Sequence, residues 1–401
     1  MTAPFGLLGR RLGHSWSPQI HRALAGYDYE LFCVEPEDLE AFLRDTPCRG
    51  LNVTIPYKKA VIPLCAELSE RARRLGSVNT MVRRAKGWYG DNTDCLGFRA
   101  MLSPFDVGGA KALVLGNGGA GTMAVQTLRD MGARVDVVSR SGPVNYENMD
   151  RDAEFIVNCT PVGMWPETWQ RPVDLREFPR CRGVADLIYN PLRTRLLLDA
   201  EALGIPAVSG LGMLVVQAKY AAELFTGTEI PDERAGAVLN NLRAQMENLV
   251  LIGMPGCGKT AVGKLLAERL DRPFFDADAL LTERYGDIPT IFAEQGEEAF
   301  RAMETEILEE LGKQSGAIIA TGGGCVTRPE NYPLLRQNGR IIRLCRPIEA
   351  LPTEGRPLSQ STPLAALLER REPLYASWAE ITIDNNGTPE DAAQAILEAI
   401  I

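Results

Sequence analysis

The stretch "ENLVLIGMPGCGKTAVGKLLAERLDRPFFDAD" (residues 247–278) has the order of an apolar strand, a glycine-rich turn, an amphipathic helix and a second strand. An earlier stretch, "KALVLGNGGAGTMAVQTLRDMGARVDVVSRS" (residues 111–141), has the same order. Short apolar runs separated by one helical segment are typical of the βαβ units that build parallel sheets. The sequence therefore predicts two α/β domains in series.

The remaining residues complete the predicted domains. Residues 1–103 mix short apolar runs with helical stretches and contain no phosphate-binding turn, so they predict a separate α/β lobe. Residues 104–209 are predicted to form the first nucleotide-binding domain, and residues 247–401 the second. Residues 210–246 predict two helices separated by "TGTEIPDE", which we assign to the N-terminal lobe.

Composition and charge argue against several classes of protein. No apolar run approaches the roughly 20 residues that a membrane helix needs, and the N-terminus lacks the layout of a signal peptide, so we expect a cytoplasmic protein without a membrane partner. The nine cysteines form no C-x-x-C pair and only two histidines are present, which indicates neither a disulfide framework nor a zinc site. Residues 247–401 carry the whole net charge of −9, which argues against nucleic acid as a partner.

The first glycine turn has the spacing G-x-G-x-x-G between a strand and a helix, the context of a Rossmann dinucleotide-binding domain. A tight structural turn is the alternative. Where an NAD site places an acidic residue, this chain has Arg140, whose cation suits the 2′-phosphate of NADP(H) unless it is only a surface arginine. The cofactor contacts predicted here are Gly116, Gly118, Gly119, Ala120, Gly121 and Arg140.

Five polar motifs surround this domain in the sequence. They are "GHSWSPQIH" (13–21), "LNVTIPYKK" (51–59), "GSVNT" (76–80), "GDNTDCLGF" (90–98) and "SGLGMLVVQAKYA" (209–221). Each alone is typical of a helix cap or a turn. Together and in this order they resemble the shikimate dehydrogenase family across roughly residues 4–246.

The resemblance implies roles for individual residues. Ser15 and Ser17 would bind the substrate carboxylate, and Thr54, Asn79 and Gln217 its hydroxyl or carboxylate groups. Tyr189, Gly212 and Met213 would lie near the nicotinamide. Lys58 and Asp94 would be the acid/base pair, because reduction of a ring carbonyl leaves an alkoxide that must be protonated as it forms. A plain structural ion pair is the alternative for these two residues.

The second glycine turn, "GMPGCGKT", satisfies G-x-x-x-x-G-K-[ST] at a strand-to-helix junction and predicts a nucleoside triphosphate site. The backbone of Gly256, Cys257 and Gly258 would cradle the phosphates, Lys259 would reach the transferred group, and Thr260 would bind Mg²⁺. In "FFDAD", Asp276 and Asp278 have strand spacing, so we expect both carboxylates on one face near the carboxyl edge of the sheet.

Four later motifs are similar to those of the shikimate kinase family over essentially all of residues 247–401. They are "GEEAFRAME" (296–304), "TGGGCV" (321–326), "GRPL" (355–358) and "RREPLY" (370–375). The similarity implies that Asp278 binds substrate hydroxyls and serves as candidate base, and that Asp276 orders Mg²⁺ through water. The remaining implied contacts are the carboxylate-binding Arg301 and Arg371, the backbone donors Gly323 and Gly324, and the lid arginine Arg356. Alternatives are a helix cap for Asp276 and a solvated arginine for Arg301.

The combined expectation is a bifunctional enzyme. NADPH would reduce 3-dehydroshikimate to shikimate, and MgATP would phosphorylate the product. A homodimer is the assembly that we allow for. A non-catalytic ligand-sensing regulator is one alternative, but the acid/base pair and the loop lysine Lys259 are all present. An NAD-linked quinate or shikimate dehydrogenase fused to a kinase is another, and Arg140 argues against it.

Overall fold

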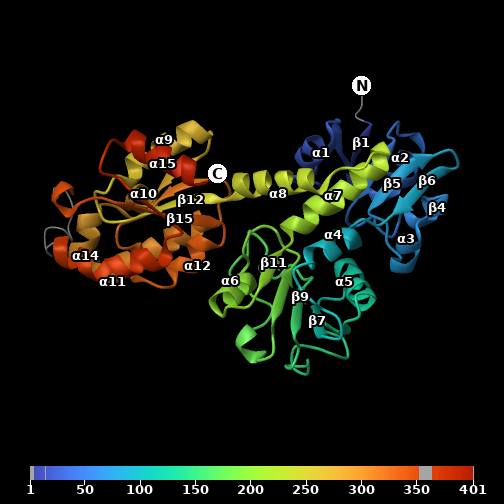
Figure 1. Cartoon of the computed structure of the whole chain (residues 1–401), viewed down its shortest axis with the longest axis horizontal. Coiled ribbons are helices and arrows are strands. Elements are labelled where there is room, and N and C mark those ends of the chain that lie inside the picture. Colours follow the sequence, from blue (N-terminus) through green and yellow to red (C-terminus); the bar gives the residue numbers. More distant parts are fainter. Residues whose placement is uncertain (1–3, 14, 352–363, 401) are drawn as a thin grey trace. The chain divides into compact units, whose positions relative to one another are not determined.

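The computed structural model describes residues 4–13, 15–351 and 364–400 of an α/β chain. It contains two compact units (Figure 1). Unit 1 comprises Met1–Gly163, Gln170–Tyr189 and Asp199–Arg243, and unit 2 comprises Met164–Trp169, Asn190–Leu198 and Ala244–Ile401. The predicted fold class is confirmed, since each unit contains parallel strands connected by helices.

Unit 1 begins with a six-stranded sheet in the order β2-β1-β3-β5-β6-β4. Its central strands are mostly buried, and β1 pairs in parallel with β2 and β3, whereas β5 runs antiparallel to β3. The strands are β1 (Phe5–Gly9), β2 (Tyr29–Cys33), β3 (Gly50–Val53), β4 (Glu67–Leu68), β5 (Thr80–Arg84) and β6 (Gly87–Asp91). The helices are α1 (Ser17–Ala25), α2 (Leu39–Asp45), α3 (Glu70–Leu75) and α4 (Asp94–Met101).

The second sheet of unit 1 has five parallel strands in the order β11-β10-β9-β7-β8. They are β7 (Lys111–Leu115), β8 (Arg134–Val138), β9 (Phe155–Asn158), β10 (Gly183–Asp186) and β11 (Ala207–Ser209). The helices along this part of the chain are α5 (Gly119–Asp130) and α6 (Arg195–Ala202), and α6 is divided between unit 2 (to Leu198) and unit 1 (from Asp199). The chain continues to β8 on one side of β7 and to β9 on the other. Such a reversal opens a crevice at the carboxyl ends of the strands, where ligands of open α/β sheets bind.

The two helices predicted after this sheet are α7 (Leu211–Thr226) and α8 (Asp232–Met246). Helix α7 contacts α1 and α4 of the first sheet's layer (Figure 1). Its buried face includes Val215, Ala218 and Ala222, which are small enough for close helix packing. The chain thus returns to its N-terminal elements before it enters unit 2.

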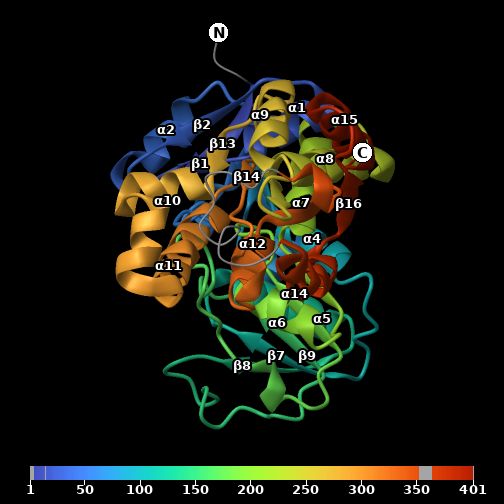
Figure 2. The ribbon, with the colours of Figure 1, turned by 90° about the vertical axis from the view of Figure 1, so that its left-hand side faces the viewer.

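The sheet of unit 2 has five parallel strands in the order β13-β14-β12-β15-β16. They are β12 (Asn248–Ile252), β13 (Phe274–Asp276), β14 (Ile318–Ala320), β15 (Gly339–Cys345) and β16 (Ile381–Asp384). Its helices are α9 (Lys259–Leu270), α10 (Ala277–Tyr285), α11 (Ile288–Gly312), α12 (Asn331–Arg336), α14 (Leu364–Trp378) and α15 (Pro389–Ala399). Helices α9 and α15 lie together on one face of the sheet, and α12 and α14 on the other (Figures 1 and 2).

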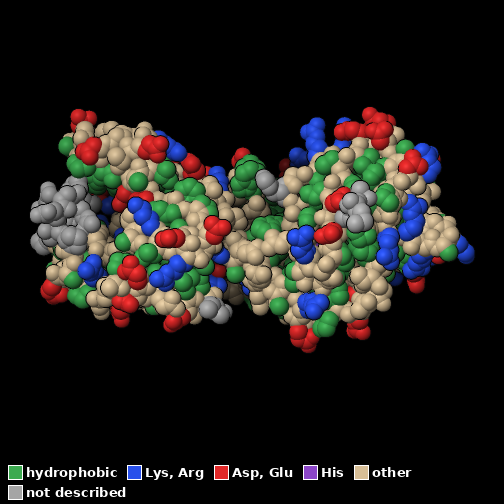
Figure 3. Space-filling model, turned by 90° about the horizontal axis from the view of Figure 1, so that it is seen from above, with side chains coloured by type: hydrophobic (Ala, Val, Ile, Leu, Met, Phe, Trp, Pro, Cys, Tyr) green, Lys and Arg blue, Asp and Glu red, His purple; other side chains and the backbone are tan. Residues whose placement is uncertain are grey.

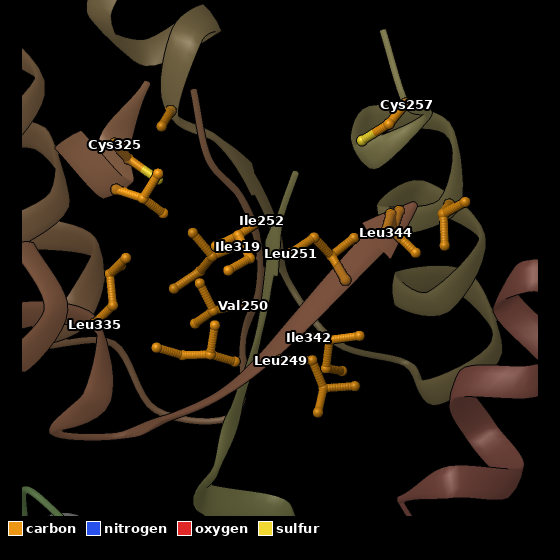
Figure 4. Close-up of a cluster of buried hydrophobic side chains, with 14 of the residues drawn as sticks. Leu249, Val250, Leu251, Ile252, Cys257, Ile319, Cys325, Leu335, Ile342 and Leu344 are labelled. Atoms are coloured by element: carbon orange, nitrogen blue, oxygen red, sulfur yellow. The ribbon is translucent and has the colours of Figure 1, made fainter. Parts of the chain in front are cut away.

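The core of unit 2 forms around β12, which is buried along its whole length. Leu249 and Leu251 point to one side of the sheet, and Val250 and Ile252 point to the other, as strand alternation requires (Figure 4). A strand with two apolar faces belongs in the middle of a parallel sheet covered by helices on both sides. The glycine turn that follows β12 is therefore held at the centre of the sheet edge.

An aromatic cluster in unit 1 encloses His21 of α1. Its ring stacks on Tyr29 at 4.2 Å between centroids, and its Nδ1 atom lies 2.6 Å from the hydroxyl oxygen of Tyr27. Burial lowers the pKa of His21 from 6.5 to about 3. The histidine is therefore neutral in the folded protein at neutral pH and has a structural environment.

We predict that this histidine makes unit 1 sensitive to acid. Below pH 6.5 the unfolded chain binds a proton that the folded chain rejects, so the free energy of unfolding falls with decreasing pH until about pH 3. The loss is about 1.4 kcal/mol per pH unit, or about 2 kcal/mol at about pH 5. Hydrogen exchange of β1 and β2 peptides at about pH 7.5 and about pH 5 measures it. The His21→Phe variant should lose this part of the pH dependence, and equal losses in both proteins would contradict the prediction.

Candidate active sites

A lysine and an aspartate form the centre of the first site, in unit 1. Lys58 lies in the loop after β3, and Asp94 is the first residue of α4. The Nζ atom of Lys58 donates a hydrogen bond to Oδ2 of Asp94 at 2.7 Å. The two side chains remain 32% and 16% exposed, so a ligand can reach both. The structure thus brings the predicted acid/base residues into direct contact.

One predicted substrate-binding amide, Asn79, contacts this pair, and a second, Gln217, contacts Asn79. The Nδ2 atom of Asn79 donates to Oδ1 of Asp94 at 2.8 Å and to Oε1 of Gln217 at 3.5 Å. Gln217 lies on α7, which packs closely on α4 because Gly97 has no side chain. A Cβ atom on Gly97 would lie 2.7 Å from the carbonyl oxygen of Met213. Close helix packing therefore joins residues that are distant in the sequence.

The predicted carboxylate-binding serines lie near the ends of β1 and β3. Ser17 is the first residue of α1, and its backbone N–H donates to Oγ of Ser15 at 3.3 Å. Thr54 directly follows β3, which runs parallel to β1, so both strands end at the same edge of the sheet. All three side chains are half-buried. The two serines are hydrogen-bonded to each other. Hydrogen bonds join Lys58, Asp94, Asn79 and Gln217 into a separate connected set.

The first glycine turn follows β7 and leads into α5. Gly116 has a φ of 105°, which favours glycine, and Gly118 is the N-cap of α5. A Cβ atom on Gly121 would lie 2.0 Å from the carbonyl oxygen of Gly116. Only glycine permits a turn this tight, and residues 118–120 are exposed at the helix N-terminus. These features fit the pyrophosphate of a dinucleotide.

Further predicted cofactor contacts lie around the same sheet. Arg140 is exposed and follows β8, the neighbour of β7, where its cation fits a 2′-phosphate. Tyr189 follows β10 and is half-buried, and burial raises the pKa of its phenol. Gly212 and Met213 lie in the first turn of α7. All belong to segments at the carboxyl ends of the strands, with α7 directly after β11.

The second glycine turn, in unit 2, follows β12 and leads into α9. Gly253, Gly256 and Gly258 have φ values of 141°, 84° and 99°, a conformation that favours glycine. Lys259 is 8% exposed, and its Nζ atom donates to the carbonyl oxygens of Gly253 and Met254 at 2.8 and 3.1 Å. The lysine thus lies across the loop, with its charge where the phosphates of a nucleotide fit.

Oxygen ligands for a cation lie beside this loop. The Oγ1 atom of Thr260 donates to Oδ2 of Asp276 at 2.6 Å. A hydroxyl and a carboxylate are the kind of ligands that Mg²⁺ prefers, directly or through water. The two residues therefore fit the predicted cation.

The predicted strand spacing of Asp276 and Asp278 is wrong. Strand β13 ends at Asp276, and Asp278 lies in the first turn of α10. The carboxylate of Asp276 accepts hydrogen bonds from the backbone N–H groups of Asp278 and Ala279 at 3.1 and 3.2 Å. This cap starts the helix one residue after the strand. Both carboxylates nevertheless line one pocket.

That pocket has a volume of about 560 Å³ and joins the phosphate loop to a set of charged side chains. It includes Lys259, Thr260, Asp276, Asp278, Arg301, Glu304, Arg371 and the glycines Gly322, Gly323 and Gly324. Apolar residues that the sequence did not single out, including Ile288 and Phe292, form another part of its wall. A small anion with an apolar ring face fits this mixture of groups.

Glu304 is a site residue that the sequence reasoning missed. Its Oε2 atom accepts a hydrogen bond from Nη1 of Arg301 at 2.7 Å, and the two side chains are 2% and 5% exposed. Burial raises the pKa of Glu304. Among the atoms that the structure describes, Oε1 of Glu304 and Nε of Arg301 are buried and have no hydrogen-bond partner, so the ion pair leaves two buried polar atoms unsatisfied. In the sequence "RAME" (301–304), Arg301 and Glu304 have the i,i+3 spacing of a helical ion pair, and this spacing could have indicated their contact.

The glycine turn after β14 is fixed by α14. The carbonyl oxygen of Gly323 accepts hydrogen bonds from Nη1 of Arg371 at 3.1 Å and from the hydroxyl of Tyr375. A Cβ atom on Gly323 would lie 2.6 Å from the ring of Pro255 in the phosphate loop. The turn thus contacts both the phosphate loop and the predicted carboxylate-binding arginine. Arg356, the predicted lid arginine, lies outside the described residues.

Two phosphate-binding turns, each associated with polar side chains of its own, define a protein with two catalytic centres. One centre is that of a dinucleotide-dependent oxidoreductase, and the other is that of a P-loop phosphotransferase.

Family models match both parts of the chain: "Shikimate dehydrogenase substrate binding domain" matches residues 7–81, and "Shikimate kinase" matches residues 255–401. The shikimate dehydrogenase (NADP(+)) of Methanopyrus kandleri is 40% identical over 281 residues, which cover 60% of this chain and 97% of the relative. The chain therefore belongs to the shikimate dehydrogenase family, with a shikimate kinase domain joined to it.

Other relatives and solved structures agree. The shikimate dehydrogenase (NADP(+)) of Synechocystis sp. is 35% identical over 60% of this chain and 96% of the relative. A chorismate mutase/shikimate 5-dehydrogenase fusion protein from Clostridium acetobutylicum has a TM-score of 0.57 and 38% identity, over 59% of this chain and 96% of that one. The Thermus thermophilus shikimate 5-dehydrogenase in complex with NADP(H) and shikimate has a TM-score of 0.54 and 30% identity. The match covers 59% of this chain and 98% of that one.

We predict that Gly121→Ala disables the first glycine turn. The added Cβ atom would lie 2.0 Å from the carbonyl oxygen of Gly116, so the turn must open. NADPH binding, measured by fluorescence titration, should weaken at least about tenfold, which is about 1.4 kcal/mol. Gly236→Ala in α8 is the matched control, because its Cβ atom would meet nothing within 4 Å. Equal NADPH affinity in the two variants would contradict the prediction.

We predict that Gly324→Ala weakens the acceptor site of unit 2. The new Cβ atom would lie 2.2 Å from Nη2 of Arg301, whose guanidinium is held by Glu304 and cannot easily move. The KM for shikimate in a kinase assay should rise at least about tenfold. NADPH-dependent reduction by the same variant should stay unchanged. An unchanged KM would show that Arg301 does not hold the acceptor.

Proposed function

We propose that this chain catalyses two consecutive reactions. Residues 1–246 reduce 3-dehydroshikimate to shikimate with NADPH, and residues 247–401 phosphorylate shikimate from MgATP. The proposal divides the first part into a substrate lobe, residues 1–103 completed by helices within 210–246, and an NADP-binding domain, residues 104–209. The observation that carries it is the hydrogen bond between Lys58 and Asp94 in one unit and the Arg301–Glu304 pocket beside a phosphate loop in the other.

In the reduction, bound NADPH supplies a hydride to the ring carbonyl. Lys58 donates a proton to the carbonyl oxygen as it becomes an alkoxide, and Asp94 stabilises the ammonium form of Lys58. A hydroxyl group results, and the lysine regains its proton from solvent. Tyr189 and Gly212 border the space for the nicotinamide.

Five polar residues orient the substrate of this reaction. Ser15 and Ser17 bind the carboxylate, and Thr54, Asn79 and Gln217 bind the ring hydroxyls. Hydroxyl and amide side chains suit a substrate with several hydroxyl groups better than an apolar pocket would. Asn79 and Gln217 are in hydrogen-bond contact, which supports a shared ligand.

In the phosphoryl transfer, Asp278 accepts the proton of the acceptor hydroxyl as its oxygen bonds to the γ-phosphorus, and the bond from that phosphorus to the β-phosphate oxygen breaks. Arg301, Arg371 and the N–H groups of Gly323 and Gly324 hold the acceptor carboxylate. Positive charge and positioning supply most of the catalysis of such transfers. Lys259, Arg356 and the backbone of residues 256–258 would stabilise the phosphates, and Thr260 and Asp276 would hold Mg²⁺, whose charge would neutralise that of the phosphates.

Neither alternative function is favoured. A ligand sensor without chemistry does not need the Lys58–Asp94 pair or the loop lysine Lys259, and both are present. An NAD-linked quinate dehydrogenase would place a carboxylate where Arg140 stands. The similar dehydrogenases described above are named for NADP(+).

The proposal includes a cytoplasmic location, small-molecule substrates, a homodimer, and neither nucleic acid nor a membrane as partner. All nine cysteines are free, which supports a reducing compartment. No helix in the described part of the chain is long and apolar enough to cross a membrane. On the face shown in Figure 3, acidic and basic side chains are interspersed, unlike the basic surface that nucleic acid requires.

A two-step assay tests the function. We expect dehydroshikimate, NADPH and MgATP together to yield NADP⁺ and ADP. Lys58→Ala should slow NADPH consumption at least about 100-fold, yet still form ADP from added shikimate. Lys259→Ala should abolish ADP formation and leave NADPH consumption unchanged. The proposal would be contradicted if either variant lost both activities, or if the unmodified protein had neither activity.

A further inference from the structure

The amide of Asn79 is held in one orientation. Its Oδ1 atom accepts hydrogen bonds from the backbone N–H of Thr93 at 2.7 Å and from Oγ1 of Thr80 at 3.0 Å. Because a backbone N–H can only donate, the atom facing it must be the amide oxygen. The NH₂ group therefore faces Oδ1 of Asp94 at 2.8 Å. The opposite orientation would place the amide oxygen against the carboxylate.

A chain of buried hydrogen bonds continues behind Thr80. The Nδ2 atom of Asn52 donates to Oγ1 of Thr80 at 3.2 Å and to the carbonyl oxygen of Asn79 at 3.4 Å. The hydroxyl of Tyr29 donates to Oδ1 of Asn52 at 2.8 Å. Thr80 is 0% exposed, and Asn52 and Tyr29 are 6% and 8% exposed, so water does not compete for these bonds.

The direction of this chain is fixed at both ends. The carbonyl oxygen of Asn79 can only accept, so the group of Asn52 that faces it is the amide nitrogen. The hydroxyl of Thr80 accepts from that nitrogen, so its single hydrogen is directed to Oδ1 of Asn79 at 3.0 Å, with Oγ1 of Thr93 as the more distant acceptor at 3.2 Å. The donors of the bonds from Asn52 to Thr80 and from Asn79 to Asp94 are thereby assigned.

We propose that Thr80 is a positioning residue for the reduction, and that Asn52 and Tyr29 support it. Its hydroxyl keeps the NH₂ group of Asn79 on Asp94, which keeps the carboxylate on Lys58 and the amide directed at the substrate. Thr80 itself bonds to neither member of the acid/base pair in the contacts described above. The inference rests on the proposed function of unit 1 and adds residues that the sequence motifs did not assign.

Removal of the Thr80 hydroxyl has a specific consequence. Asn79 would keep the backbone bond from Thr93 at 2.7 Å. Of the two hydroxyl donors to its oxygen, it would lose the nearer one, Thr80 at 3.0 Å, and keep Oγ1 of Thr93 at 3.2 Å, so its amide would be held less firmly. The Nδ2 atom of Asn52 would keep only its longer bond, at 3.4 Å. The acid/base pair would then spend less time in the reactive geometry, and a buried donor would be left poorly paired.

Three threonine variants test this proposal. Thr80→Val removes the hydroxyl and keeps the side-chain shape, and Thr80→Ser keeps the hydroxyl. Thr127→Val is the matched control, because Thr127 is also buried and its hydroxyl donates within α5, to the carbonyl oxygen of Met123 at 2.9 Å and to its sulfur at 3.8 Å. Single-turnover oxidation of NADPH by saturating dehydroshikimate measures the chemical step. Thr80→Val should slow it at least about tenfold, whereas Thr80→Ser should stay within about threefold and Thr127→Val unchanged.

Two results would overturn the proposal. One is equal rates in Thr80→Val and Thr127→Val, and the other is equal slowing in Thr80→Val and Thr80→Ser, which would implicate side-chain packing instead of the hydroxyl. If Thr80→Val does not fold, Tyr29→Phe decides: it should slow turnover about threefold at unchanged NADPH affinity, and an unchanged rate would overturn the proposal. If the unmodified protein were inactive, that result would contradict the proposed function itself and not the positioning role of Thr80.

Discussion

A protein backbone can bind a phosphate directly only where no side chain lies between its N–H groups and the ligand. Two turns in this chain meet that constraint. In the first, a side chain on Gly121 would occupy the space of the Gly116 carbonyl oxygen, and in the second, Gly253, Gly256 and Gly258 have positive φ values. Each turn follows an interior strand of a parallel sheet, so the binding groups lie at the carboxyl ends of the strands. The arrangement of both sites depends on these turns.

Burial of charge distinguishes the two candidate sites. Lys58 and Asp94 are partly exposed and neutralise each other, so they can exchange a proton with a substrate that reaches them. Arg301 and Glu304 are almost completely buried, and an unpaired charge at that depth would be costly. Their pairing leaves two buried polar atoms without partners in the described structure, in residues that line a pocket. Under the proposed function, one site thus presents a proton donor, and the other presents fixed charge.

Under the proposed function, the two sites recognise the same carboxylated ring with different groups. Hydroxyl and amide side chains surround it in unit 1, and an arginine pair and glycine N–H groups hold it in unit 2. The difference follows from the chemistry, because hydride transfer needs a proton at one oxygen and phosphoryl transfer needs positive charge around a spreading negative charge. The hydroxyl formed by the first reaction becomes available to the second.

The sequence by itself determined the α/β class, the two glycine turns and the helices α7 and α8. These features depend on local conformation and on hydrophobic periodicity, which neighbouring residues decide. The sequence also indicated the Lys58–Asp94 pair through its motifs. The place of Asp278 on a helix follows from a local interaction, the cap formed by Asp276, which the sequence offered only as an alternative to strand alternation. Only the tertiary structure decided the burial of the Arg301–Glu304 pair, because other elements of unit 2 must cover it. It also decided the hydrogen bonds from Tyr29 through Asn52 and Thr80 to Asn79, since these join side chains that meet only when separate strands assemble.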